Sequence, residues 1–368
     1  NRMTIPYVNL KLQYAKEKGL INKIKKVLKS GNFILNEELA YFEKSISKLC
    51  NKKFAVGLNS GTDALTLGLK LVGVGKGDEV ITPPNSFISS TSSIVHLGAK
   101  PKFVDVLPDQ NIDPNLIENS ITSKTKAIMP VHLSGRVCEM DKIIKISKKY
   151  KIPIVEDAAQ SIGSKYKNNP SGSFGLISCF STHPLKNLNA CGDGGFIVTD
   201  EKSYYKKAKM LRNNGFINRN IVKQFAYLSR LDEMQAAILN YRLKNLNKLI
   251  KIRRSNAKFY FKNLNRKNIY FPDEKTYQYN SYHTFVVQIK NRNKIAKKLK
   301  TLGIETSIHY PIPIHLQPAA KFLNYRKGQF PICEAQAKKI LTLPINQYLT
   351  QKELTRICKI LNKLTNEK

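Results

Sequence analysis

The stretch Ser181–Asp200, STHPLKNLNACGDGGFIVTD, holds a single lysine, Lys186, between a proline and a cluster of glycines. Lysine is abundant throughout the chain, so the simplest interpretation of Lys186 is one more solvated surface charge. A lysine becomes a nucleophile, however, when burial or neighbouring cations lower its pKa. The segments around this stretch distinguish these two interpretations, and they also indicate the fold.

Short apolar runs that end in polar residues recur along the chain before Lys186. They are FAVGLNSGTDAL (54–65), DEVITPPNSFISS (78–90), TKAIMPVHLSG (125–135), IPIVEDAA (152–159) and LISCFST (176–182). Helical patterns separate these runs, and strands that alternate with helices predict a mainly parallel, mixed α/β sheet covered by helices on both faces. Ligands of such sheets bind beyond the carboxyl ends of the strands, where each of the polar clusters is expected.

The chain of 368 residues is long enough for two domains in one compact unit. Residues 10–50 have apolar residues at helical spacing, and we assign residues 1–244 to a large domain with this helical segment at its start. From residue 245 the pattern changes to a long basic amphipathic helix (244–264), an alternating strand (282–291), and a helix, turn and strand (294–310). Residues 245–368 are therefore expected to form a smaller C-terminal α+β domain.

The formal charge of +36 is compatible with nucleic-acid binding, but its distribution argues against it. The basic residues are mostly lysines dispersed along the chain and often beside asparagine, without the clustered arginines and interleaved aromatics of a nucleic-acid site. The six cysteines are scattered with no CxxC pair, which predicts neither a disulfide framework nor a metal site and favours the cytoplasm. No apolar run reaches the length of a transmembrane helix, and the N-terminus lacks the apolar core of a secretory signal.

Two of the polar clusters contain groups that could bind a phosphate and a protonated ring nitrogen. Gly61 and Thr62 lie at a strand-to-helix turn, where backbone N–H groups and the helix dipole favour an anion, although Ser-Gly-Thr before a helix is more often only a cap. Asp157 ends an apolar strand, where its carboxylate needs a partner such as a pyridinium nitrogen. Taken alone, Asp157 is more simply the N-cap of the next helix.

Three further residues complete the pattern of a cofactor site. Phe87 lies just beyond a strand and could cover a flat ring, although most such residues belong to the core. Ser181 could supply another phosphate donor, and Lys186 could form a Schiff base. A phosphate cup, a stacking ring, a carboxylate and a lysine in this order together indicate a pyridoxal-phosphate site.

Five motifs carry a resemblance that extends over nearly the whole chain: NSGTDAL, EDAAQ, HPLKNLNACGDGG, SRLDEMQAAIL and IHYPIPIHLQPA. On these motifs the sequence resembles the DegT/DnrJ/EryC1/StrS sugar aminotransferases, which are fold-type I pyridoxal-phosphate enzymes. The resemblance implies that Lys186 forms the internal aldimine and shuttles the proton, and that Asp157 pairs with the pyridinium nitrogen. It also implies that Gln160 approaches the phenolic oxygen, that Phe87 stacks on the ring, and that the phosphate is held by Gly61, Thr62 and Ser181.

The resemblance further implies a ping-pong transamination from an amino donor, typically glutamate, to a keto-sugar carried on a nucleotide, in amino-sugar or surface-glycan biosynthesis. The sequence of the motif IHYPIPIHLQPA resembles family members that act on 3-keto sugars more than those that act on 4-keto sugars. Candidate substrate contacts are His183, His309, Tyr310 and His315, and packing beside Pro318 is an equal alternative for His315. A keto-cyclitol aminotransferase and a non-catalytic homologue remain the alternative functions, and intact Lys186 and Asp157 count against the second.

The family is expected to form homodimers with shared active sites, and this sequence departs from it at the shared region. Ala226 and Leu228 stand where the family usually has Gly and Asn, and that Asn reaches the partner's cofactor phosphate. Leu228 cannot donate a hydrogen bond, which puts this contact in doubt. Asn36 also stands where Gly is usual.

Overall fold

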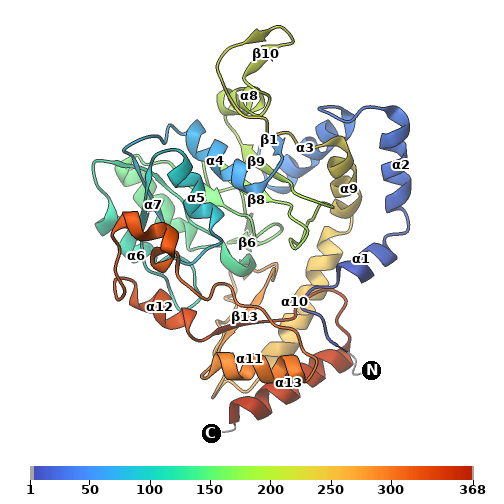
Figure 1. The fold of residues 1–368 in the computed structure, drawn as a ribbon, viewed down its shortest axis with the longest axis vertical. Helices are drawn as coiled ribbons and strands as arrows, with labels where there is room; N and C mark the ends of the chain where they lie inside the picture. The colour runs from blue at the N-terminus through green and yellow to red at the C-terminus, as the bar shows by residue number, and fades with distance from the viewer. Residues whose placement is uncertain (1–3, 367–368) are drawn as a thin grey trace.

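A computed structural model describes residues 4–366, and its centre is a mixed sheet covered by helices on both faces (Figure 1). A four-stranded group in the order β1-β9-β8-β5 lies beside a three-stranded group in the order β3-β2-β4. The parallel bridges Ile128–Ile154 and Val131–Asp157 join the two groups through β4 and β5. The strands are β1 (Phe54–Leu58), β2 (Glu79–Thr82), β3 (Lys100–Phe103), β4 (Thr125–Ile128), β5 (Val155–Asp157), β8 (Ile177–Ser181) and β9 (Gly195–Thr199).

Within this sheet β9 is the only strand that runs against the others, because it pairs antiparallel with both β1 and β8 whereas the remaining neighbours pair parallel. The expectation of a mainly parallel mixed sheet is therefore confirmed. The reversal has a consequence for the site. The start of β9 and the glycines before it lie at the same edge as the carboxyl ends of the other strands.

Alternating side chains of the strands pack into separate hydrophobic clusters on the two faces of the sheet. In β9, Phe196 and Val198 join the cluster beneath α3 and α9, whereas Ile197 joins the cluster beneath α4 and α8. The helices of this half are α1 (Leu10–Lys16), α2 (Leu20–Ser30), α3 (Glu37–Leu49), α4 (Gly61–Leu71), α5 (Ser89–His96), α6 (Pro114–Ile117), α7 (Met140–Tyr150), α8 (Lys202–Leu211) and α9 (Glu233–Leu243). The helical character expected for residues 10–50 is confirmed.

Asn36 has a local structural reason for its place. It is the N-cap of α3, and its Oδ1 accepts a 2.9 Å hydrogen bond from the N–H of Glu37. Asparagine is among the preferred N-cap residues because its short side chain satisfies a backbone donor that the helix leaves free. The departure from the usual glycine therefore gives α3 a defined start.

The C-terminal half is built around α10 (Leu246–Asn263), which extends toward the end of the molecule where both termini lie (Figure 1). The antiparallel pair β13 (Phe285–Gln288) and β14 (Ile340–Leu343) packs with α10, α11 (Arg292–Thr301) and α13 (Gln351–Asn366) into one cluster. The expected strand at the end of residues 294–310 is not formed. Residues 304 and 307 make single bridges only, one to Ile5 and one to Thr342.

Two segments connect the halves and position residues at the site. Ile5 from the N-terminus packs in the C-terminal cluster. In the opposite direction, the segment before and within α12 (Pro331–Ala337) returns to β3, where Phe330 and Cys333 pack with Phe103. The domain boundary at residue 245 falls between α9 and α10, and it stays a prediction.

The remaining elements are short. A small sheet has the order β12-β6-β7, and a separate hairpin pairs β10 with β11 and projects from the top of the view in Figure 1. Their bounds are β6 (Lys165–Tyr166), β7 (Asn169–Pro170), β10 (Phe216–Asn218), β11 (Ile221–Val222) and β12 (Gln278–Tyr279). Across residues 4–366, none of the helices combines the length and apolar character needed to cross a membrane.

Candidate active site

A cavity of about 360 Å³ opens beyond the carboxyl ends of the parallel strands. Ten of the eleven residues singled out from the sequence line it: Gly61, Thr62, Phe87, Asp157, Gln160, Ser181, His183, Lys186, His309 and Tyr310. They come from segments far apart in the chain, so the sheet edge and the C-terminal half together bring them to one place.

Asp157 ends β5 at the floor of the cavity and is only 4% exposed. Its Oδ2 accepts a 2.6 Å hydrogen bond from Ser90 Oγ, and its Oδ1 accepts a 3.2 Å bond from the N–H of Ala159. Burial raises the pKa of Asp157, while these two bonds and the positive charge of Lys186 oppose the rise. A carboxylate in this setting is suited to pair with a cationic group that enters the cavity.

Lys186 lies in the loop between β8 and β9, on the wall that also contains Ser181. Burial lowers the pKa of Lys186 from 10.5 to about 8, and Asp157 acts in the opposite direction. About one molecule in ten then holds a neutral amine at pH 7. The surface-charge interpretation does not fit this environment, because a neutral amine is the form that attacks a carbonyl.

The N-terminus of α4 forms one end of the cavity. Ser60 caps the helix by accepting a 3.1 Å bond from the N–H of Asp63, and Gly61 is the first helical residue. A Cβ on Gly61 would lie 2.6 Å from Cβ of Ser181, so glycine is what lets this turn approach β8. Thr62 Oγ1 lies 2.8 Å from Ser89 Oγ, which brings further hydroxyl groups to the helix end. Hydroxyls and N–H groups at a helix N-terminus suit a phosphate.

Aromatic and amide side chains form another part of the wall. The ring of Phe87 is 6.2 Å from that of Tyr310, and Phe87 is 56% exposed. Gln160 accepts a 2.8 Å bond from the N–H of Ser134 through Oε1 and donates a 3.3 Å bond to the hydroxyl of Tyr310 through Nε2. Because both ends of its amide are bonded, Gln160 has a fixed orientation.

His309 and His183, two of the three histidines that line the cavity, are neutral at pH 7. Burial and the charge of Lys186 lower the pKa of His309 to about 4, and its Nδ1 lies 2.8 Å from Oγ1 of Thr342. The same two causes lower the pKa of His183. Neutral imidazoles offer one donor and one acceptor each, as expected for groups that bind hydroxyls.

His315 is the one predicted site residue that the structure does not bring to the cavity. It is 3% exposed, its Nε2 lies 3.0 Å from Oε1 of Glu334, and its ring packs edge-on against Phe330 at 4.7 Å. The packing alternative describes this environment, in which Glu334 and Phe330 contact the ring.

Several residues of the cavity were not singled out from the sequence: Tyr7, Ser90, Arg253, His283 and Asn346. Arg253 left a signal, because Leu246, Ile250, Ala257 and Tyr260 share its face of α10 at helical spacing and are all buried. A charged residue on an apolar face indicates a special role. The sequence around Tyr7 and Asn346 carries no such signal, because only the fold brings these two residues to the cavity.

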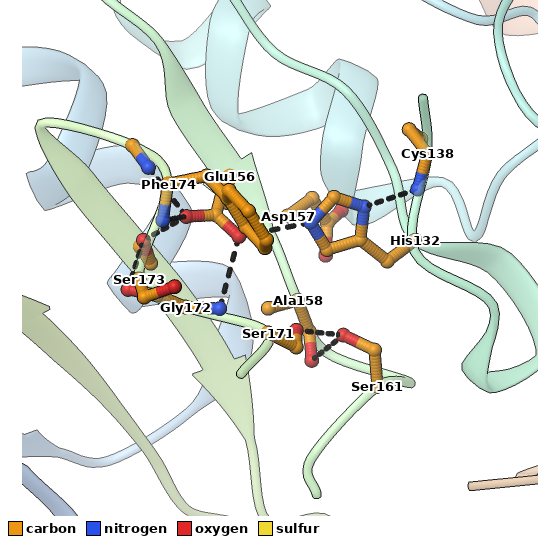
Figure 2. Close-up of polar contacts among 12 residues, drawn as sticks. His132, Cys138, Glu156, Asp157, Ala158, Ser161, Ser171, Gly172, Ser173 and Phe174 are labelled. Atoms are coloured by element: carbon orange, nitrogen blue, oxygen red, sulfur yellow. Dashed lines mark hydrogen bonds and ion pairs between the residues drawn. The ribbon is translucent and has the colours of Figure 1, made fainter. Parts of the chain in front are cut away.

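Behind Asp157, the preceding residue Glu156 is fully buried in a network of donors (Figure 2). Its carboxylate accepts bonds of 2.5–2.9 Å from His132 Nε2, Ser178 Oγ and three backbone N–H groups, those of Gly172, Phe174 and Gly175. Nδ1 of His132 accepts the N–H of Cys138, which fixes Nε2 as the protonated nitrogen. Burial raises the pKa of Glu156, but the hydrogen bonds outweigh it and the pKa lies below its ordinary value.

These features fit pyridoxal phosphate as a resident cofactor. The hydroxyl groups at the start of α4 suit its phosphate, the buried carboxylate of Asp157 suits its protonated ring nitrogen, and the amine of Lys186 suits its aldehyde. A Cβ at Gly61 would clash with Ser181, so glycine at this position is what keeps the start of α4 close to the end of β8.

A scan of protein families matches the DegT/DnrJ/EryC1/StrS aminotransferase family to residues 15–362. The chain belongs to this family. Membership confirms the resemblance drawn from the motifs, the fold-type I architecture, and the class of pyridoxal-phosphate-dependent aminotransferases.

Curated relatives of this aminotransferase match over nearly their full length. The chain is 38% identical to a dTDP-3-amino-3,6-dideoxy-alpha-D-galactopyranose transaminase of Aneurinibacillus thermoaerophilus, covering 98% of this chain and 99% of the relative. It is 35% identical to the UDP-2-acetamido-2-deoxy-3-oxo-D-glucuronate aminotransferase of Pseudomonas aeruginosa, covering 96% and 98%. It is 37% identical to a pleiotropic regulatory protein of Geobacillus stearothermophilus, covering 95% and 96%.

Solved structures of related proteins have the same fold as this chain. DesV of S. venezuelae in complex with a ketimine intermediate superposes with a TM-score of 0.96 at 34% identity and full coverage of both chains. NtdA of Bacillus subtilis with bound cofactor PMP superposes with a TM-score of 0.92 at 30% identity, over 100% of this chain and 86% of the other.

Proposed function

We propose that this aminotransferase moves an amino group from an amino acid, most readily glutamate, to the C3 carbonyl of a nucleotide-linked keto-sugar. The observation that carries the proposal is Lys186, which shares one cavity with Asp157 and has a pKa lowered to about 8. The sugar is supported by the relatives, whose names describe 3-amino or 3-oxo nucleotide sugars.

The reaction balances without an external oxidant or metal. The amino acid loses its α-hydrogen and amino group, takes an oxygen from water and leaves as a 2-oxo acid. The sugar's carbonyl carbon gains the hydrogen and the amino group, and its oxygen leaves as water. Pyridoxal phosphate, when bound, supplies the electron sink and carries the amino group between the two halves. Lys186 Nζ takes the proton from the α-carbon of the amino acid in one half and gives a proton to the sugar carbon in the other. Asp157 keeps the ring nitrogen protonated.

The neutral histidines and Tyr310 are proposed contacts of the sugar. His183 and His309 stay uncharged because burial and Lys186 lower their pKa values. Tyr310 is oriented by Gln160, and burial raises the pKa of its hydroxyl, so it remains a neutral donor. Because these groups are uncharged, they can form hydrogen bonds with the hydroxyls of a sugar ring without neutralising the carboxylate of Asp157.

We further propose a homodimer. Residues of the β10–β11 hairpin and the segment after it expose large apolar side chains, an arrangement typical of an interaction surface: Ile217, Ile221, Val222, Phe225 and Leu228. Sedimentation of the purified protein at several micromolar concentrations tests the proposed dimer. A monomer at every concentration would refute it. The cytoplasmic location stays a prediction.

The decisive experiment for the substrate is a panel of acceptors offered to the glutamate-loaded enzyme: matched nucleotide-linked 3-keto and 4-keto sugars and scyllo-inosose. We expect turnover with the 3-keto sugar to exceed that with the others. Turnover with the inosose alone would replace the nucleotide sugar by a cyclitol. No turnover with any acceptor, in a protein that also fails to react with glutamate, would favour a non-catalytic homologue.

A further inference from the structure

Arg253 of α10 is a buried cation without an acidic partner in residues 4–366. It lines the cavity and is 5% exposed. Its Nη1 donates to the carbonyl oxygens of Tyr282 and His283 at 3.1 and 3.2 Å, and its Nη2 donates to Oε1 of Gln347 at 3.2 Å. Its Nε has no hydrogen-bond partner. Every acceptor around the guanidinium is neutral, so its charge is not compensated.

Other buried arginines of the chain differ from Arg253 in this respect. Arg212 forms an ion pair with Glu43, and Nε of Arg136 lies 4.0 Å from Oδ2 of Asp109. Arg292 is bonded to carbonyl groups and to Asn293 through all three nitrogens, and it does not line the cavity. A buried charge without a partner is costly. An anion that enters the cavity would therefore bind more favourably at Arg253 than at an arginine whose charge is already compensated.

The surroundings of Arg253 contain a second unsatisfied polar atom. Nδ1 of His283 is buried without a partner, and His283 also lines the cavity. Tyr7 and Asn346 line the same cavity, and Lys186 and Arg253 also share a small adjoining recess. Burial lowers the pKa of Arg253 to about 10, which leaves the guanidinium charged at neutral pH.

We propose that Arg253 binds the carboxylate of the amino-acid donor and so positions the donor's α-carbon for Lys186. The inference rests on the proposed aminotransferase function and adds a donor-binding residue to it. A guanidinium matches a carboxylate in shape and binds it through charge-assisted hydrogen bonds. A carboxylate is common to amino-acid donors, whereas an acceptor sugar carries one only when it is a uronate. The location of Arg253 in the cavity of Lys186 therefore favours the donor.

The test compares the two half-reactions in single-turnover experiments on wild type, Arg253→Lys and Arg253→Met. With L-glutamate and no sugar present, we expect the substitutions to weaken apparent glutamate binding about 10- to 100-fold. The reverse half-reaction, in which the amine is the nucleotide-linked amino-sugar product without a carboxylate on its sugar ring, should change less than threefold. Arg254→Lys is the matched control, because Arg254 pairs with Glu274 outside the cavity, and it should bind glutamate as wild type does.

L-Alanine as a donor separates the two carboxylates of glutamate. If Arg253 binds the α-carboxylate, the Arg253 variants should bind both alanine and glutamate more weakly, and to the same degree. If Arg253 binds the side-chain carboxylate, the variants should bind only glutamate more weakly. Binding of glutarate to the cofactor-free protein, measured by calorimetry, gives a readout independent of turnover and should also weaken in both Arg253 variants.

Three outcomes would overturn the inference. One is glutamate binding that is unchanged in a folded Arg253→Met variant. Another is an equal loss in both half-reactions, which would indicate a structural role. The third is a loss confined to turnover with a uronate acceptor, which would assign the guanidinium to the sugar. A wild type that reacts with no amino acid at all would instead refute the proposed function, so the two failures are distinguishable.

Discussion

Ser90 Oγ lies 2.6 Å from Oδ2 of Asp157, and this bond joins the first turn of α5 to the carboxyl end of β5. Both residues are buried. Of the groups that oppose the rise in the pKa of Asp157, Ser90 acts most strongly. The protonation state of Asp157, the acid that we propose pairs with the cofactor, is therefore set partly by a residue from another element.

We predict that Ser90→Ala weakens cofactor binding. Without the hydroxyl, the pKa of Asp157 rises further, and a neutral acid is a poorer partner for a pyridinium nitrogen. The expected loss of pyridoxal-phosphate affinity is about 5- to 50-fold, measured by titrating the cofactor-free protein. Ser93→Ala is the control, because Ser93 is equally buried in α5 but donates only to the carbonyl of Ser90. Equal affinities in the two variants would contradict the assigned role.

Lys186 leads to a prediction about pH. Because burial lowers its pKa to about 8, the rate at which the cofactor-free enzyme captures pyridoxal phosphate should rise through a midpoint near pH 8. The unfolded chain binds an extra proton between pH 8 and the ordinary value of 10.5, so folding stability should rise with pH across this window. Lys186→Met should lose both effects. A capture rate still rising at pH 10 would show that the lysine is not desolvated.

Glu156→Gln should destabilise the fold by about 3–5 kcal/mol. The carboxylate accepts five hydrogen bonds, and an amide would turn two of its protons toward existing donors (Figure 2). The pKa of Glu156 is lowered below 4.5, so its stabilisation is present above that pH and is lost as the pH falls further. Chemical denaturation should therefore show a gap between wild type and variant that narrows below pH 4.5. A gap that does not change with pH would argue against an ionised Glu156.

His315→Gln separates packing from substrate contact. The bond to Glu334 and the contact with Phe330 place His315 outside the cavity. We expect the substitution to lower the free energy of unfolding by about 1–3 kcal/mol, measured by thermal denaturation, and to leave KM for donor and sugar within about twofold. His309→Gln, inside the cavity, provides the contrast with a raised KM for the sugar. A raised sugar KM with unchanged stability in His315→Gln would restore the substrate interpretation.

The part of the site that lies at the carboxyl ends of the parallel strands could be predicted from the sequence. Parallel strands bring their carboxyl ends to one edge, so polar residues after apolar runs, such as Asp157 and Ser181, were expected to lie together before the fold was known. The reversed direction of β9 was not expected, because an apolar run does not show which way a strand runs. That reversal places the start of β9, and with it Asp193, at the same edge.

Residues that act through tertiary contacts were missed for a different reason. Ser90 is one serine among several in its segment, and only the approach of α5 to β5 gives it a partner. Arg253 could have been found from its place on the apolar face of α10, but the overall excess of basic residues hid it. His315 lies close in sequence to His309 and Tyr310, yet the chain turns away toward β3 between them.

The most direct test of the central assignment is one spectroscopic experiment on purified protein loaded with pyridoxal phosphate. L-Glutamate is added without any sugar, the cofactor's visible absorbance is followed, and 2-oxoglutarate is quantified by mass spectrometry, with Lys186→Ala alongside. We predict that the wild type loses the absorbance and releases one 2-oxoglutarate per active site, whereas Lys186→Ala does neither. A wild type that binds the cofactor but releases no oxo acid from any amino acid would show that the protein is not an aminotransferase. A Lys186→Ala variant that releases the oxo acid at the wild-type rate would show that Lys186 is not the reactive lysine.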